Sequence, residues 1–159
     1  MVKHVSFSTT ELVRDTCMCL HVQRAARALA RRFDDALRPV GLTNAQFSLI
    51  MSLNRPGPAG MKSVADLLAM DRTTLTAALK VLERRGLVAI RVDPKDKRGR
   101  LLSLTRSGQA VLKAAVPLWR ATQGAITALP ALEQPDRLRA ELTALSRPAA
   151  LASRAEANR

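Results

Sequence analysis

Two apolar helical runs in the middle of the chain are separated by almost no connecting sequence. The first, SVADLLAM, begins at Ser63 with a Ser-x-x-Asp pattern that resembles a capping box, so Ser63 is the predicted start of that helix. Asp71 is the predicted N-cap of the second run, DRTTLTAALKVLERRG, and Gly86 is well placed to end it. Only Ala69 and Met70 lie between the first helix and the second cap. So short a connection is typical of a helix-turn-helix.

Two helices are expected before this pair. Residues 11–38 have an apolar stripe at spacings of three and four, which predicts one long helix. The stretch LTNAQFSLIMSLNR follows as a second helix with Thr43 as its N-cap and with Phe47, Ile50 and Met51 facing inward. The run PGPAG at residues 56–60 breaks that helix.

A hairpin and further helices are expected after the pair. The runs LVAIRV and LLSLT have the alternation of β-strands, and the charged stretch 93–100 joins them. A long helix is expected from about Ser107 to beyond Trp119, and a last one within EQPDRLRAELTALS. The end of the chain, RPAALASRAEANR, is expected to be a frayed basic tail.

The predicted fold class is therefore mainly α. It is a winged helix-turn-helix with a two-stranded β-hairpin wing, flanked by long N- and C-terminal dimerisation helices. The expected parts are an N-terminal dimerisation helix (1–41), a winged DNA-binding domain (42–106), and C-terminal dimerisation helices with the basic tail (107–159). The outer helices are longer than a small winged domain needs, and a second copy of the chain is the simplest cover for their apolar faces.

The charge of the chain predicts a polyanionic partner. The formal net charge is +13 over 159 residues, which draws nucleic acid or an anionic membrane surface at long range. No apolar run approaches the roughly 20 residues that cross a bilayer, and the N-terminus MVKHVSFSTT has no apolar signal region. The charge alone therefore leaves nucleic acid and a membrane surface open, no membrane-spanning segment is expected, and the expected location is the cytoplasm. The motifs described below favour double-stranded DNA as the partner, and no membrane.

The sequence offers little for catalysis or metal binding. It has two cysteines and two histidines, with no Ser-His-Asp set, no Gly-rich phosphate loop and no Cys or His pairs at zinc spacing. Cys17 and His21 are four residues apart on one helix face, but no third ligand accompanies them. We therefore expect no enzyme activity, no cofactor and no metal site.

The second helix of the pair has two distinct faces. A projection at about 100° per residue places four apolar residues toward the core: Leu75, Ala78, Leu79 and Leu82. The outward face is short and partly cationic, with Arg72 at the start of the helix followed by Thr73, Thr76, Ala77, Lys80 and Arg84. Small side chains let a helix approach a major groove, and threonine can bond base edges or phosphates. The alternative is an ordinary solvated face.

The loop of the hairpin carries four cations within six residues: Lys95, Lys97, Arg98 and Arg100. As a wing, these side chains would reach the DNA backbone or the minor groove. Asp96 is unusual beside DNA, and it is expected to pair with a neighbouring arginine and hold its guanidinium in one rotamer. The alternative is a solvated turn.

Taken together, these stretches resemble the MarR family of bacterial transcriptional regulators from about residue 20 to residue 145. The most specific part contains Arg91, Asp96, Arg98, the run LSLT and Gly108. The resemblance implies a dimer with interlocked terminal helices, with Arg98 in the minor groove and Asp96 orienting it. It also implies that five residues lie in or beside the major groove: Thr73, Thr74, Thr76, Ala77 and Lys80.

The resemblance also implies an effector. Members are commonly repressors released by a small, often aromatic molecule that binds between the dimerisation helices and the winged domain. The candidates in this chain are Cys19, His21 and Trp119. Some relatives sense hydroperoxides through a cysteine near the position of Cys19, but their tyrosine partners are absent, since the chain has no tyrosine. Cys19 is therefore expected to be a buried apolar residue, and Trp119 to pack in the core or at the dimer interface or to line a ligand pocket.

The sequence thus predicts a DNA-binding transcriptional regulator, a repressor that binds a pseudo-palindromic operator as a homodimer and is released by a small ligand. One alternative is a non-specific architectural nucleic-acid-binding protein, which the charge alone would favour. An aromatic content of 3% argues against a stacking platform for single strands. Another alternative is a redox-responsive regulator that acts through Cys19.

Overall fold

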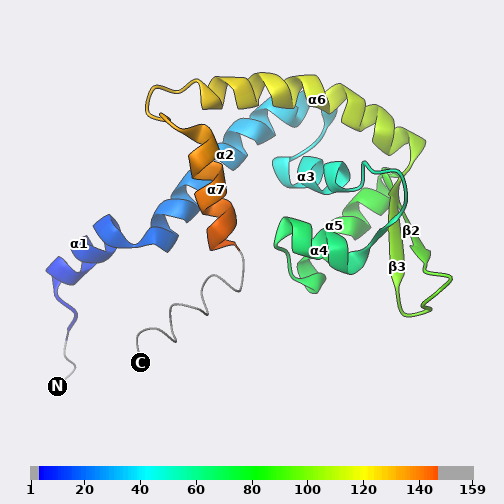
Figure 1. Cartoon of the computed structure of the whole chain (residues 1–159), viewed down its shortest axis with the longest axis horizontal. Helices are drawn as coiled ribbons and strands as arrows, with labels where there is room; N and C mark the ends of the chain where they lie inside the picture. The colour runs from blue at the N-terminus through cyan, green and yellow to red at the C-terminus, as the bar shows by residue number, and fades with distance from the viewer. Residues whose placement is uncertain (1–3, 147–159) are drawn as a thin grey trace.

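The computed structural model describes residues 4–146 and has the predicted winged helix-turn-helix fold. The element order is α1 (Phe7–Thr16), α2 (Met18–Leu37), η1 (Arg38–Val40), α3 (Asn44–Ser52), β1 (Ala59–Gly60), α4 (Met61–Leu68), α5 (Arg72–Arg84), β2 (Val88–Val92), β3 (Arg100–Leu104), α6 (Arg106–Thr127) and α7 (Pro135–Leu145). In Figure 1, α6 lies along the top, α2 rises diagonally from α1 to meet it, and α3, α4, α5 and the sheet lie below the right-hand end of α6. Helix α7 turns back across α2. The predicted basic tail lies outside the described residues.

The prediction of one long helix over residues 11–38 is wrong. The helix begins earlier, at Phe7 after the Ser6 cap, and it is broken at Cys17, where the backbone is extended with ψ near 103°. The break leaves the Asp15 carbonyl free to accept a hydrogen bond from the His21 ring at 3.1 Å. His21 therefore caps the end of α1 from the first turn of α2. The sequence has neither proline nor glycine at this place, so no local signal marked the break.

The start of α4 also differs from the prediction. The helix begins at Met61 with Gly60 as its N-cap, and Ser63 is not the cap, because its hydroxyl donates to the Gly60 carbonyl at 3.0 Å. Asp66 pairs with Lys62 at 2.5 Å in place of a capping-box contact. The caps predicted at Thr43 and Asp71 are confirmed, since each side chain accepts a backbone N–H of its own first turn.

The sheet has one strand more than the predicted two-stranded wing. The hairpin pairs β2 with β3 in an antiparallel register, with Ile90 opposite Leu102. The short strand β1 adds to the other side of β3, so the order is β1-β3-β2. It comes from the end of the stretch PGPAG, where two residues are too few to show an alternating pattern.

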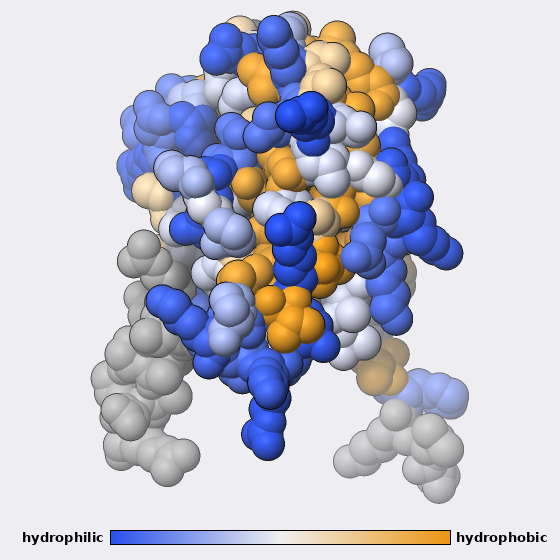
Figure 2. All heavy atoms as spheres, turned by 90° about the vertical axis from the view of Figure 1, so that its right-hand side faces the viewer, coloured by the Kyte–Doolittle hydropathy of each residue, from blue (hydrophilic) through white to orange (hydrophobic). Residues whose placement is uncertain are grey.

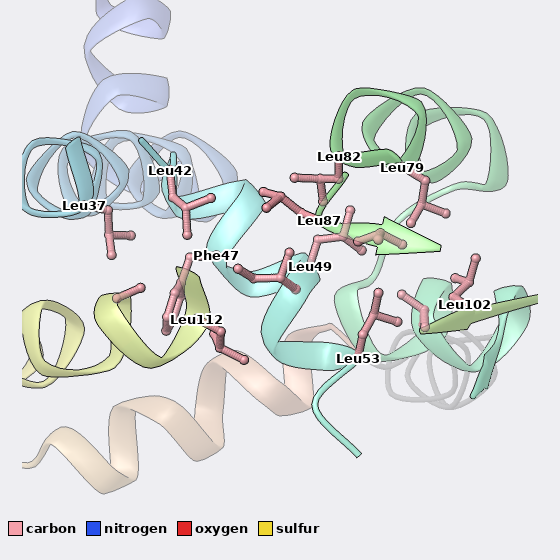
Figure 3. Packing of buried hydrophobic residues seen from close by; sticks show 14 of the residues in the cluster. Leu37, Leu42, Phe47, Leu49, Leu53, Leu79, Leu82, Leu87, Leu102 and Leu112 are labelled. Atoms are coloured by element: carbon pink, nitrogen blue, oxygen red, sulfur yellow. The ribbon is translucent and has the colours of Figure 1, made fainter. Parts of the chain in front are cut away.

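The hydrophobic core joins the winged part to the long helices. Figure 3 shows leucines of α3, α5 and the sheet packed together beside Leu37 of α2 and Leu112 of α6. Phe47 and Ile50 are buried as predicted, whereas Met51 is half-buried and Leu49 is buried in addition. Because α2 and α6 share this core with α3, the winged part is held at a fixed place on the long helices.

The long helices leave an apolar groove uncovered. It lies between α2 and α7, has a volume of about 730 Å³, and is lined mainly by Met18, Val22, Ala25, Ala26, Leu29, Leu138, Leu142 and Leu145. The apolar stripe predicted on α2 is therefore buried toward the C-terminal end of the helix and exposed toward its N-terminal end. Phe33 and Leu37 are buried, while Val22 and Leu29 are 36% and 39% exposed. Within residues 4–146, none of the helices has both the length and the apolar composition that a membrane span requires.

Candidate nucleic-acid interface

Helix α5 is fixed by its N-terminal cap and by its buried face. The Asp71 carboxylate accepts the Thr74 hydroxyl at 2.5 Å and the Thr74 backbone N–H at 2.8 Å. These bonds, the hydroxyl first and the N–H second, lower the pKa of Asp71 below its ordinary value. Leu75, Leu79 and Leu82 are almost fully buried on the opposite side from the predicted contact face. The helix is therefore held with that face toward solvent.

The lowered pKa gives a testable pH dependence. Because deprotonated Asp71 is the form that the cap favours, its stabilisation is present above the ordinary aspartate pKa of about 4 and is lost as the pH falls through the lowered folded value. We expect the wild type to have a higher Tm than Asp71→Ala at pH 7, and we expect the difference to shrink as the pH falls below that ordinary value. Calorimetry of both proteins checks this, and a difference that is unchanged at low pH would contradict it.

The turn between α4 and α5 is as tight as the sequence predicts. Ala69 adopts the left-handed conformation with φ of 49°, the one non-glycine residue with a positive φ in the described part of the chain. The Met70 N–H then donates to the Ala65 carbonyl at 2.9 Å and closes the end of α4. The two helices of the motif are thereby set at a fixed angle.

Most of the predicted contact residues of α5 lie together. Five of them line a shallow depression of about 390 Å³ on the outer face of the helix: Arg72, Thr73, Thr76, Ala77 and Lys80. Thr76 is half-buried and its hydroxyl donates to the Arg72 carbonyl at 2.7 Å, whereas Thr74 is committed to the Asp71 cap. Arg84 is exposed in the last turn of α5 and does not line the depression.

The wing is a turn held by aspartates. Asp93 accepts the Lys95 N–H at 2.8 Å, and Asp96 accepts the Arg98 N–H at 2.9 Å. The predicted pairing of Asp96 with an arginine side chain is not what the structure has, since its carboxylate binds the backbone of Arg98 and not the guanidinium. The sequence could not separate these two contacts. Either way, Asp96 fixes the position from which Arg98 projects.

A second hollow of about 530 Å³ brings the wing and α5 together. Arg98 and Arg100 of the wing line it together with Arg72 of α5 and Lys62 of α4. Asp93 and Asp96 lie at the same hollow. Figure 2 faces the side of the molecule that carries the hairpin, and hydrophilic side chains project from much of it. Four cations around one hollow suit the oxygens of a phosphate backbone.

The cations predicted to contact DNA are not neutralised by carboxylates. The ion pairs among residues 4–146 involve Arg14, Arg38, Lys62, Arg137 and Arg139. None of these five belongs to α5 or to the wing, although Lys62 lies at the edge of the hollow. Arg100 is turned back onto the Lys97 and Gly99 carbonyls, at 3.2 and 2.9 Å.

The segment after the wing connects α5 to α6. Thr105 caps α6 by accepting the Gly108 N–H at 3.0 Å, and its hydroxyl donates to the Gly86 carbonyl at 2.6 Å. Gly86 has φ of 68° and ends α5, as predicted. Gly108 lies directly against the Leu87 backbone. The run LSLT and the glycine after it therefore hold the end of α5 against the start of α6.

Arg85 is a residue that the sequence reading missed. Its guanidinium donates to the Gly41 carbonyl at 2.8 Å and to the Gln46 amide oxygen at 3.0 Å. These partners are 44 and 39 residues away in the chain. No periodicity or local motif reports a contact of this kind.

Trp119 packs in the core and also lines a pocket. Its ring stacks on Phe47, with centroids 6.1 Å apart and an interplanar angle of 19°. The pocket has a volume of about 410 Å³ and lies between α3, α4 and α6, lined by Phe47, Ser48, Met51, Ser52, Leu67, Leu68 and Trp119. Its walls are apolar apart from two hydroxyls, so it suits a flat, uncharged ring.

The prediction that Cys19 is a buried apolar residue is wrong within the protomer. Cys19 is exposed, and its Sγ accepts a hydrogen bond from the Gln23 amide at 3.2 Å. Cys17 is half-buried at the break between α1 and α2. The reason is that the N-terminal half of α2 is not covered by the rest of the chain. Among residues 4–146, no group of three potential metal ligands comes together.

Comparison with known proteins agrees with this geometry. A family model described as the MarR family matches residues 40–99. The structure is similar to that of the Mycobacterium tuberculosis transcriptional regulator MosR in complex with DNA, with a TM-score of 0.75 and 39% identity. That match covers 90% of this chain and 98% of MosR. The chain belongs to the MarR family.

Other relatives in the family are similar over a smaller part. The Rhodopseudomonas palustris transcriptional activatory protein BadR is 36% identical over 107 residues, which are 65% of this chain and 61% of BadR. The structure of Bordetella bronchiseptica BpsR, whose DNA binding is regulated by 6-hydroxynicotinic acid, is 25% identical with a TM-score of 0.71. That match covers 81% of this chain and 92% of BpsR. MosR is a transcriptional regulator, and BadR is a transcriptional activatory protein. The family and the fold together therefore indicate a winged helix-turn-helix protein that binds DNA and regulates transcription.

Proposed function

We propose that the protein is a homodimeric transcriptional repressor that binds a pseudo-palindromic DNA site and is released by a small ligand. The observation that carries the proposal is the hollow in which Arg72 of α5 and Arg98 of the wing face the same space. A winged helix contacts duplex DNA with these two elements at once, α5 in the major groove and the wing beside it. The likeness to DNA-bound MosR supports the same arrangement.

Each contact residue has a role in this proposal. Thr73, Thr76, Ala77 and Lys80 lie in the major groove, where Ala77 leaves room for close approach and Lys80 and Thr73 reach bases or phosphates. Thr74 holds the cap, and Arg72 and Arg84 contact phosphates at the two ends of α5. In the wing, Arg98 enters the minor groove, while Lys95, Lys97 and Arg100 face the flanking backbone and Asp96 holds the turn.

The homodimer in this proposal is formed through the groove between α2 and α7. A groove lined by Val22, Leu29, Leu138 and Leu142 exposes apolar area that a second copy of the chain would bury. The division into an N-terminal dimerisation part (1–41), a winged domain (42–106) and a C-terminal dimerisation part (107–159) belongs to the same proposal.

The test is a fluorescence-anisotropy titration at near-physiological salt. One duplex is taken from the DNA that flanks the protein's own coding region, and the other is a scrambled duplex of equal length. Affinity for the first that is higher by a factor of about 10³ or more, with two protomers per site, supports a specific regulator. Equal and salt-sensitive binding of every duplex, including those selected from a random pool, would favour the architectural alternative. A promoter–reporter fusion then separates repression from the activation that BadR is named for.

The wing is tested by Arg98→Ala. We expect affinity for a duplex selected from the random pool to fall about 30-fold or more per dimer, because each of the two half-sites loses a contact worth roughly 1 kcal/mol or more. Tm should not change, because Arg98 is exposed. Arg120→Ala removes the same charge from an exposed position on α6 and is the matched control. Binding by Arg98→Ala that equals the control's would remove the wing from the interface.

The effector site in this proposal is the pocket beside Trp119. Its walls carry no charged side chain, so the ligand is an uncharged aromatic molecule or the aromatic part of a larger one. 6-Hydroxynicotinic acid, which regulates BpsR, is an example of an aromatic ring as an effector. Because Trp119 is the only tryptophan and stacks on Phe47, ligand entry should change its fluorescence. Phenolics can be screened by that signal and then by release of labelled DNA.

A second candidate function is control by thiol oxidation, which the exposure of Cys19 favours. Hydrogen peroxide would oxidise the Cys19 thiol to a sulfenic acid with release of water. Attack by the Cys17 thiol would then form a disulfide and release a second water, at the junction of α1 and α2. A loss of about 2 Da together with DNA release, in the wild type and not in Cys17→Ser, would support this function. DNA release by peroxide in both proteins alike would argue against it.

A further inference from the structure

Arg85, at the C-terminal end of the recognition helix α5, binds two segments that are distant from it in the sequence. The residue directly follows α5, and its guanidinium uses one nitrogen for the Gly41 carbonyl and the other for the Gln46 amide oxygen, at 2.8 and 3.0 Å. Gly41 is the left-handed residue, with φ of 68°, that ends η1 after α2. Gln46 lies in the first turn of α3. The fork of a single arginine thus spans the corner at which α2 turns into α3.

The start of α3, to which Arg85 binds, is itself held by hydrogen bonds. The Gln46 amide oxygen also accepts the Thr43 N–H at 3.2 Å, as one half of a capping box. One residue further along, Asp34 of α2 accepts the Asn44 N–H at 2.6 Å. Hydrogen bonds therefore join α2 to the first turn of α3, and the first turn of α3 to the end of α5. We call this pair of contacts, Asp34 with Asn44 and Gln46 with Arg85, the corner clamp.

The other long helix meets α5 at the same end. Thr105 at the start of α6 bonds the Gly86 carbonyl, and Gly108 packs on Leu87. Both long helices are therefore attached to α5 within three residues of its C-terminal end. The base-contact residues lie at the other end, beginning with Arg72 and Thr73.

We propose that Arg85 is a positioning residue that fixes the direction of α5 relative to α2 and thereby sets the half-site spacing that the homodimer accepts. The inference rests on the proposed function, because spacing has a meaning only for a dimer on DNA. Helix α5 is long enough for a small rotation at Arg85 to displace the base-contact residues by a full base-pair rise. A helix of 13 residues is about 20 Å long, so a rotation of about 10° at Arg85 moves the far end by roughly 3.4 Å, the rise of one base pair.

The hydrogen bonds of Arg85 distinguish a positioning residue from a cation that only binds phosphate. Each terminal nitrogen of the guanidinium already donates one N–H to a protein oxygen, which fixes the plane of the group. A lysine keeps the charge but has a single nitrogen at its tip, so it cannot hold the two acceptors in the arginine geometry. Arg85→Lys therefore removes the clamp and keeps the electrostatic attraction. Arg85→Ala removes both.

The experiment measures how binding depends on spacing. A duplex is first selected with the wild-type protein from a random-sequence pool, and derivatives with one base pair added or removed between the half-sites are then made. We expect the wild type to bind both derivatives at least about tenfold more weakly than the selected duplex. For Arg85→Ala and Arg85→Lys, we expect this ratio to fall below about threefold, while Arg120→Ala keeps the wild-type ratio.

The outcomes are distinct. An unchanged spacing ratio in both Arg85 variants overturns the inference and leaves the proposed function intact. If Arg85→Lys matches the wild type while Arg85→Ala weakens every duplex by one common factor, Arg85 acts by charge, which also overturns it. If the wild type selects no duplex with two half-sites, the proposed function fails and the inference fails with it. Circular dichroism of each variant confirms that the ratios are measured on folded protein.

Discussion

Gly108→Ala is expected to destabilise the folded state by about 3 kcal/mol, although alanine is the better helix former. A methyl group at this position would lie 2.0 Å from the Leu87 carbonyl oxygen and 3.0 Å from its carbon. Both atoms belong to the backbone, so they cannot move aside as a flexible side chain would. The gain in helix propensity is about 1 kcal/mol, and a forced backbone shift costs more than that.

The measurement is urea unfolding followed by circular dichroism at fixed protein concentration. Gly124→Ala is the matched control, since it makes the same change in the same helix, where the added methyl group meets no atom within 4 Å beyond the adjoining part of its own helix. We expect it to be neutral or stabilising by up to about 1 kcal/mol. Equal stability of the two variants would show that α6 does not pack on Leu87 as described.

The parts of the fold that the sequence predicted are those fixed by local chemistry. Thr43 and Asp71 cap the helices that follow them because a short acceptor side chain reaches the free N–H groups of the first turn. Gly86 ends α5 because the turn needs a positive φ. The two faces of α5 followed from the helical period, and the structure confirms the burial of Leu75, Leu79 and Leu82.

The errors arise at contacts that the hydrophobic period does not report and in very short segments. At the break at Cys17, the His21 ring bonds the Asp15 carbonyl, a side-chain contact that periodicity does not report. The strand β1 exists because β3 offers it an edge, and two residues carry no pattern of their own. Cys19 was expected to be buried because it continues an apolar stripe. That stripe is buried only at Phe33 and Leu37, near the C-terminal end of α2, where the helix packs on α3 and α6.

The residues of the candidate interface could be selected from the sequence, whereas the residues that support them could not. Charge and small side chains marked α5 and the wing, since these properties belong to the residues themselves. Arg85 has the same charge and is one residue from Arg84, yet its guanidinium is committed to Gly41 and Gln46. Only the fold separates an arginine available to DNA from one that holds the helix in place.

Ala77→Glu is expected to lower affinity for the selected duplex by about 100-fold or more without unfolding the protein. Ala77 is exposed and lies in the middle of the depression between Thr73 and Lys80. A glutamate there would set a carboxylate against the phosphates and fill the space that close approach requires. A loss of roughly 1.4 kcal/mol at each half-site is a factor of about ten, and two half-sites multiply it to about 100.

The control for net charge is Ala114→Glu, an exposed position on α6 that receives the same residue. Long-range electrostatics fall equally in both variants, so only the position of the new carboxylate differs. Anisotropy titrations of the two proteins at several salt concentrations therefore isolate the local effect. An affinity of Ala77→Glu within about threefold of the control's would mean that α5 does not enter a groove. Because Ala77 is solvent-exposed and glutamate is a good helix former, circular dichroism and Tm should match the wild type, so the loss can be assigned to the interface.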